Sequence, residues 1–194
     1  KDLPHLFFTH QTEGGATTNN ISTNNYTTYG QTVNSHLEEN EDGTFTRIEY
    51  TLLHVTVEIY DADFHLVASR TIPKELPVYR GYFRGDGARY LAFSQVNKEE
   101  SDDVEVFRIV KYDENWNRLG ACSLYGANTS QIGMCLSMTE RNGMLYVHAC
   151  HTMYAINSIN HQSNISLIID ENTMQVLTQN TQGSYPEYVS HSFN

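Results

Sequence analysis

The segment His151–Asn164, HTMYAINSINHQSN, gathers histidine, asparagine, glutamine and tyrosine side chains between two stretches with strand-like patterns. Imidazole and amide groups donate and accept hydrogen bonds, while a tyrosine ring offers a flat apolar face. Sugars are bound by this combination of groups. The segment therefore predicts a ligand-binding loop, and its candidate residues are His151, Tyr154, Asn160, His161, Gln162 and Asn164.

Other interpretations of the same segment stay open. Metal binding by His148, His151 and His161 is one, although their spacing suits a helix better than a strand and no acid lies beside them. Catalysis is another, with a histidine as nucleophile or base of a transferase or hydrolase. The polar side chains would alternatively bond only the loop's own backbone. No nucleophile elbow, phosphate-binding glycine loop or paired-carboxylate signature occurs, so we assign no catalytic residue and expect no cofactor.

The acidic segment VNKEESDD (96–103) is a weak calcium candidate through Asn97, Glu99, Asp102 and Asp103. Calcium loops place oxygen ligands at alternate positions and need a glycine at the sharp turn. This segment has neither feature, so a solvated acidic loop is the favoured interpretation.

Composition restricts the partners. The chain has 12 basic and 23 acidic residues, a formal charge of −11. Binding to nucleic acid or to an anionic membrane depends on clustered Lys and Arg, so we expect neither partner. No apolar run approaches the ~20 residues that span a bilayer, so we expect no membrane insertion. Three cysteines, Cys122, Cys135 and Cys150, are too few for a disulfide scaffold. One disulfide between neighbouring strands and three buried thiols both remain possible.

The elements that would position these residues form a repeat. Three segments align without gaps: EIYDADFHLVAS (58–69), VKYDENWNRLGA (110–121) and LIIDENTMQVLT (167–178). Each has an apolar strand that ends at Asp61, Asp113 or Asp170, followed by a second strand. Aspartate suits such turns because its side chain bonds nearby backbone N–H groups. Each segment therefore predicts a β-hairpin whose turn carries a structural aspartate.

A second pattern keeps step with the hairpins. YLAFSQ (90–95) and LYVHAC (145–150) are β-prone and each follows a glycine-containing turn. One repeat thus contains four antiparallel strands in about 50 residues, the unit of a β-propeller blade. We predict an all-β, propeller-like domain over 1–194 with blades at about 31–72, 79–125 and 132–179. A β-sandwich built from the same hairpins is the alternative.

The ends suggest partial blades. YVSHSFN (188–194) is typical of an opening strand, so a further blade is expected to start within 185–194, and HLFFTH (5–10) is typical of a second strand. Open rings leave sheet edges exposed. We therefore expect the chain to be part of a larger propeller or to self-associate through unpaired edges.

The stretches ELPVYRGYF, SDDVEVFRIVKYDENWNRLG, HTMY…NHQSN and YVSHSFN together resemble a group of uncharacterised extracellular, propeller-like proteins of Firmicutes (Clostridia). The resemblance runs from about Tyr26 to the C-terminus. It implies an exported protein at the cell surface and no particular activity. The expected function is a secreted or cell-surface binding module, with a glycan or a surface protein as partner. The alternatives are a histidine-dependent enzyme and a self-assembling structural protein.

Overall fold

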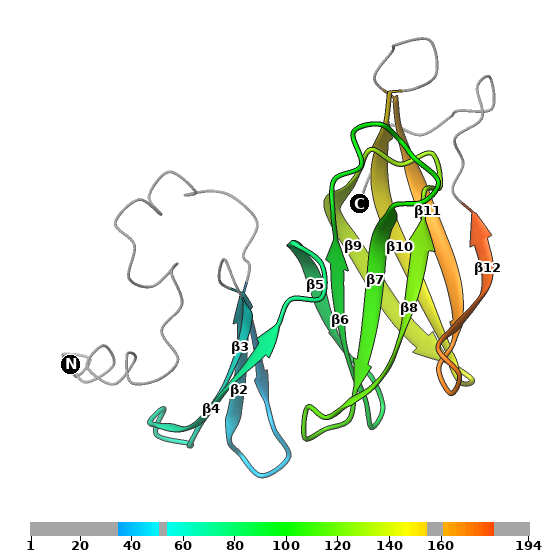
Figure 1. Ribbon diagram of the computed structural model, residues 1–194. Coiled ribbons are helices and arrows are strands. Elements are labelled where there is room, and N and C mark those ends of the chain that lie inside the picture. The colour runs from blue at the N-terminus through cyan, green and yellow to red at the C-terminus, as the bar shows by residue number, and fades with distance from the viewer. Residues whose placement is uncertain (1–34, 51–53, 155–160, 181–194) are drawn as a thin grey trace, which may run out of the picture. The chain divides into compact units, whose positions relative to one another are not determined.

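The computed structural model describes residues 35–50, 54–154 and 161–180, and every regular element within these ranges is a β-strand. Twelve strands form three antiparallel sheets of four, here called sheets A, B and C (Figure 1). In each sheet the strands lie side by side in the order of the sequence. The all-β class predicted from the sequence is confirmed, and each sheet is a simple up-and-down meander.

The described residues divide into two compact units between Lys74 and Glu75, with sheet A in the first and sheets B and C in the second. Sheet A contains β1 (Ser35–Glu39), β2 (Phe45–Tyr50), β3 (His54–Tyr60) and β4 (Leu66–Pro73). Sheet B contains β5 (Val78–Arg84), β6 (Arg89–Ser94), β7 (Glu105–Tyr112) and β8 (Arg118–Tyr125). Sheet C contains β9 (Gln131–Arg141), β10 (Met144–Met153), β11 (His161–Asp170) and β12 (Gln175–Asn180). The expected partial blades at 5–10 and 185–194 lie outside the described residues.

The three aspartates lie at the hairpins between the third and fourth strands, where the sequence placed them. The Oδ1 atom of each accepts a backbone N–H from the far side of its turn: His65 to Asp61 at 2.8 Å, Asn117 to Asp113 at 2.8 Å and Thr173 to Asp170 at 2.9 Å. These backbone bonds, the largest influence on each carboxyl, lower the pKa of Asp61 and Asp170. The aspartates therefore fix the turns as side-chain caps.

Each of these hairpins also holds one residue with left-handed backbone. Phe64 and Trp116 have φ of 63° and 62°, and their N–H groups bond the carbonyls of Asp61 and Asp113 at 3.0 Å. In the third hairpin the left-handed residue is Met174, with φ of 54°. The third turn is therefore one residue longer than the other two. After this turn, the gap-free alignment of the three sequence segments is wrong by one residue.

Sheet A has an unusual charged cluster on one face. Glu58 is fully buried and accepts hydrogen bonds from Arg47 at 2.7 Å and from the Tyr60 hydroxyl at 2.8 Å. Burial, together with the Glu58 carboxylate, raises the pKa of Tyr60 to about 12. A buried carboxylate needs such partners because its desolvation is costly.

Sheets B and C pack face to face around one apolar core (Figure 1). Buried core side chains come from alternate positions of the inner strands, as the two-residue period of a strand requires. Sheet B contributes Tyr90, Ala92, Ile109, Cys122 and Leu124, among others, and sheet C contributes Leu145, Val147, Ala149, Ile165, Leu167 and Ile169.

Acidic side chains close one end of this core. The Tyr90 hydroxyl donates to Glu171 Oε1, and Lys111 Nζ donates to the Glu171 carbonyl, both at 2.8 Å. The carboxyl of Glu140 accepts the backbone N–H of Asp86 and lies beside the carboxyl of Glu171. Burial, the Glu171 carboxyl and the Asp86 charge raise the pKa of Glu140. The neighbouring negative charges thus favour the protonated form of Glu140.

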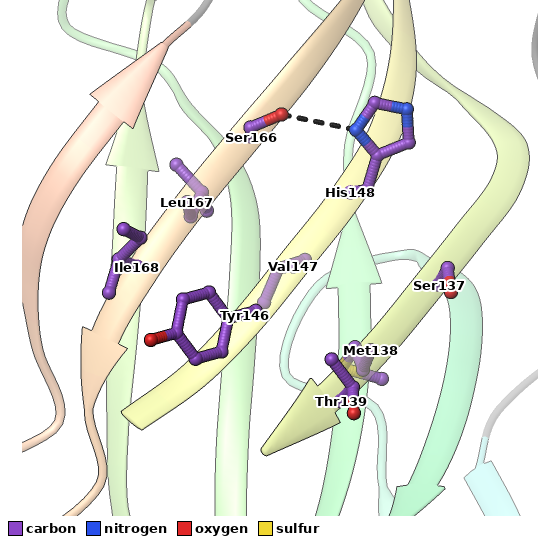
Figure 2. Close-up of a pocket in the computed structure, with 9 residues that line it drawn as sticks. All are labelled: Ser137, Met138, Thr139, Tyr146, Val147, His148, Ser166, Leu167 and Ile168. Atoms are coloured by element: carbon purple, nitrogen blue, oxygen red, sulfur yellow. Dashed lines mark hydrogen bonds between the residues drawn. The ribbon is translucent and has the colours of Figure 1, made fainter. Parts of the chain in front are cut away.

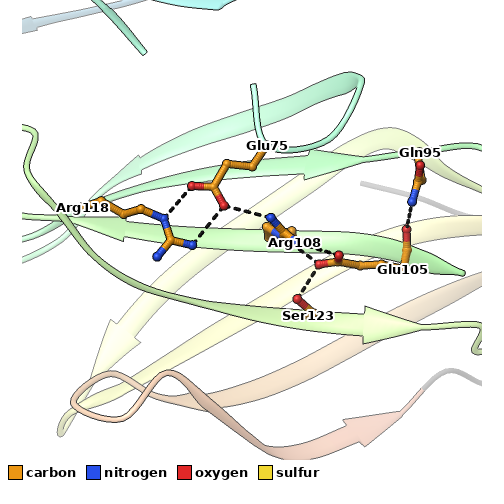
Figure 3. Close-up of polar contacts among 6 residues, drawn as sticks. All are labelled: Glu75, Gln95, Glu105, Arg108, Arg118 and Ser123. Atoms are coloured by element: carbon orange, nitrogen blue, oxygen red, sulfur yellow. Dashed lines mark hydrogen bonds and ion pairs between the residues drawn. The ribbon is translucent and has the colours of Figure 1, made fainter. Parts of the chain in front are cut away.

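The face of sheet B that points away from sheet C holds an ion-pair network (Figure 3). Arg108 lies between Glu105, at 2.7 Å, and Glu75, at 3.0 Å, and Arg118 donates to the same Glu75 at 2.6 Å. Burial alone would raise the pKa of Glu75, but the hydrogen bonds from Arg118 and Arg108 outweigh it and hold the pKa below its ordinary value. The network ties the segment before β5 to strands β7 and β8.

Candidate functional site

The predicted ligand loop is mostly strand. The β10–β11 ladder continues from Met144↔Asp170 to Met153↔His161, so the connection is limited to residues 154–160. The prediction of a loop from His151 to Asn164 is therefore wrong. Alternation along β10 explains the polar residues, because His151 and Met153 face the core while Thr152 between them faces the other way.

His151 is a core residue at the end of the B–C core. Its side chain is buried, and its Nδ1 atom lies 2.8 Å from Thr129 Oγ1. Ser163, directly opposite in the ladder, is buried as well. Neither side chain is open to a substrate in this arrangement, so the pair does not form an accessible catalytic site. The loop before β9 supplies the hydroxyl that bonds the Nδ1 atom of the imidazole.

The remaining candidates from this segment are dispersed. Tyr154 is exposed, and its backbone N–H donates to the carboxylate of Glu100. Gln162 is exposed and Asn164 half-buried on β11. His161 is the first residue of β11. Asn160 lies outside the described residues.

The proposed metal ligands do not converge. His148 and His151 are three residues apart on β10 and therefore point to opposite faces of sheet C. In the acidic loop, both side-chain atoms of Asn97 bond the backbone of Ser101, at 2.9 and 3.0 Å. Within the part of the chain that the structure describes, no group of three or more His, Cys, Asp or Glu is placed to hold a metal ion.

A candidate binding site lies on the outer face of sheet C, which is the face away from sheet B (Figure 2). A groove of about 310 Å³ crosses β9, β10 and β11. Its outward-facing side chains are Ser137, Thr139, Tyr146, His148, Ser166 and Ile168, and its floor includes Met138, Val147 and Leu167.

Two polar groups in the groove are oriented by each other. His148 Nδ1 lies 3.1 Å from Ser166 Oγ, its cross-strand neighbour on β11. Tyr146 lies one row along, with a side chain 39% exposed, opposite Ile168. The groove therefore combines an aromatic face, an imidazole and several hydroxyl groups.

Sheets B and C are both four-stranded meanders, so positions on this face can be matched to positions in sheet B. Arg89 pairs with the residue before Asp113, and Leu145 pairs with the residue before Asp170, so these two positions are equivalent. Counting along the strands from them makes Tyr146, His148 and Ser166 equivalent to Tyr90, Ala92 and Ile109. Those three side chains of sheet B are fully buried in the core.

The alternation of apolar and polar residues in LYVHAC (145–150) was the sequence signal for this site. Sequence reasoning missed it because nothing in one sequence says which face of a strand is covered. The sequence pattern points to His148 only as a metal ligand and does not single out Tyr146.

No helix in ranges 35–50, 54–154 and 161–180 has the length and hydropathy needed to cross a membrane. In comparisons with known proteins, no family model matches the sequence, and no curated protein matches it either.

Proposed function

We propose that the protein is a secreted or cell-surface binding module that binds a carbohydrate in the groove of sheet C. The observation that supports this most is the change of chemistry at equivalent positions. Sheet B has Ala92 and Ile109 where sheet C has His148 and Ser166, and the surface there is hollowed instead of packed.

The groove suits a sugar for two reasons. A pyranose has an apolar C–H face that packs on an aromatic ring, and Tyr146 offers such a ring beside Ile168. It also has hydroxyl groups around its rim, which need partners that both donate and accept hydrogen bonds. The His148–Ser166 pair supplies both roles, as do the hydroxyls of Ser137 and Thr139.

A glycan array followed by calorimetry on the positive sugars tests this proposal. Tyr146→Ala should weaken binding about tenfold, which corresponds to a loss of ~1.4 kcal/mol. Tyr125→Ala is the matched control, because Tyr125 is 55% exposed on β8, outside the groove. Equal affinity in both variants, or no bound sugar at all, would contradict the proposal.

A second candidate is self-assembly through the same face. We propose that sheets B and C are successive repeats of a propeller-like arrangement, in which one sheet packs on the next. In that case a further sheet, from a second copy or a following repeat, would cover the groove. The supporting observation is that Tyr146 and Ser166 are equivalent to the fully buried Tyr90 and Ile109.

Light scattering over a range of concentrations separates the two candidates. Self-assembly predicts a mass that rises with concentration and returns to the monomer in Ser166→Arg, since a long charged side chain prevents close packing of the face. Carbohydrate binding predicts a constant mass in the absence of sugar. Both candidates agree with an extracellular location, which fractionation of the producing cells would test.

A further inference from the structure

Two cysteines meet on neighbouring strands of sheet C. Cys135 is on β9 and Cys150 is on β10. In the β9–β10 ladder, Cys135 is one of the three β9 residues that lie opposite Cys150. Cys150 is buried and Cys135 half-buried, and neither is in a disulfide in this structure.

A β-bulge places Cys150 opposite Cys135. The β9–β10 register shifts between Ala149↔Leu136 and His151↔Ile132, so Cys150 alone faces three residues of β9. Its sulfur leans over Gly133, where a Cβ atom would overlap it. Glycine at this position thus leaves room for the sulfur beside Cys135. Bulges of this kind redirect side chains.

The pair lies next to the groove. Alternation along β10 places Cys150 on the same face as Tyr146 and His148, one row beyond the row of His148 and Ser166. The third cysteine, Cys122, is in β8 of sheet B, within the core. Burial raises the pKa of Cys122 to about 11. Cys122 therefore serves as an internal control.

The geometry points to Cys135 and Cys150 as a reversible redox pair that closes to a disulfide across the bulge when a small-molecule disulfide is present. In the first step the Cys135 thiolate attacks one sulfur of oxidised glutathione, forming a mixed disulfide and releasing one glutathione thiolate. In the second step the Cys150 thiolate attacks the Cys135 sulfur and releases the second glutathione. The two protein thiols lose two electrons and two protons, which the oxidant takes up as two molecules of reduced glutathione.

The roles of the two sulfurs follow from their surroundings. Cys135 is the more accessible, so it meets the oxidant first. Burial, and the contact with Cys135, raise the pKa of Cys150. A small thiolate fraction makes Cys150 slow towards an external oxidant. Contact with Cys135 nevertheless makes it effective as the second, resolving thiol.

Thiol titration with oxidised glutathione tests this inference on the full chain. The denatured wild-type protein should show three free thiols before oxidation and one afterwards, with peptide mapping assigning the new bond to Cys135 and Cys150. Incubation with reduced glutathione should restore all three. A count that stays at three in protein with an unchanged circular dichroism spectrum would overturn the inference, as would a bond to Cys122.

Single variants test the order of the two steps. Cys150→Ser should accumulate one glutathione on Cys135, because the resolving thiol is missing. Cys135→Ser should take up little glutathione, and Cys122→Ser should oxidise like the wild type. Equal glutathionylation of the Cys135→Ser and Cys150→Ser variants would contradict the assigned roles.

Discussion

Two substitutions of Trp116, to alanine and to glycine, test the hairpin geometry. In ordinary strand backbone the alanine variant is the more stable, and at this position we expect the glycine variant to be the more stable. The Trp116 side chain is 9% exposed, its ring centroid lies 5.9 Å from that of Tyr82 and 5.8 Å from that of Tyr112, and the Arg89 guanidinium lies 5.3 Å above it. Removing such a ring costs about 3–5 kcal/mol. At the same time the residue has φ of 62°, which any side chain with a Cβ adopts at a cost.

Trp116→Ala and Trp116→Gly lose the same ring but differ in backbone strain. Alanine keeps the left-handed penalty of roughly 1 kcal/mol, and glycine removes it. Trp116→Gly should therefore be more stable than Trp116→Ala by about 1 kcal/mol. In ordinary strand backbone glycine is instead the less stable of the two, by about 0.5–1 kcal/mol.

Urea unfolding followed by far-ultraviolet circular dichroism measures both variants without relying on the fluorescence of the substituted tryptophan. Phe64 provides a matched control, since it has the same φ but a side chain 43% exposed. Phe64→Gly should be neutral or stabilising relative to Phe64→Ala, with a much smaller loss from the missing ring. If Trp116→Gly is the less stable of its pair, the left-handed hairpin position is wrong.

Three further predictions concern single side chains. Asp113→Ala should cost about 0.5–2 kcal/mol in urea unfolding, because the Asn117 N–H loses its cap, whereas the wild-type turn survives in Asp113→Asn. Arg47→Ala should lower the free energy of unfolding by about 3 kcal/mol, because the buried Glu58 carboxylate loses its cationic partner. The double variant with Glu58→Gln should recover much of that loss. The raised pKa of Glu140 means that the folded protein binds its proton more tightly than the unfolded chain, so this group stabilises in acid and its contribution falls as pH rises through the folded pKa. Glu140→Gln should therefore raise the melting temperature at neutral pH, with the difference from wild type shrinking towards acid; a difference independent of pH would refute the raised pKa of Glu140.

The strands and hairpins were predictable because their signals are local. The aspartates at 61, 113 and 170 bond backbone groups two to four residues away, so their spacing carries the information that fixes the turn. The one-residue offset of the third hairpin was not predictable from those signals. DENWN and DENTM have the same turn chemistry, and only the ladder shows that the left-handed residue moves from the fourth to the fifth position.

The candidate site depended on information that is not local. His151 and His148 are three residues apart on one strand, yet one bonds Thr129 inside the core and the other lies in an open groove. Which of the two is exposed follows from the position of sheet B, and that is a property of tertiary packing. The polar segment at 151–164 resembled a loop because polar residues are rare in a core. The Thr129 hydroxyl donates to the Ala127 carbonyl and makes this exception possible by accepting a hydrogen bond from the imidazole.

Polarity on the outer face of sheet C also bears on the choice between its two proposed occupants. A sheet-on-sheet interface formed like the B–C core would bury His148 and Ser166 where sheet B buries Ala92 and Ile109. Burying those polar groups is favourable only if the covering surface supplies hydrogen-bond partners, since an unsatisfied polar group costs about 1–3 kcal/mol. A carbohydrate brings such partners on every hydroxyl, whereas an apolar sheet face like the one that sheet C turns towards sheet B does not. The chemistry of these two positions therefore favours a polar ligand in the groove over another copy of the apolar core.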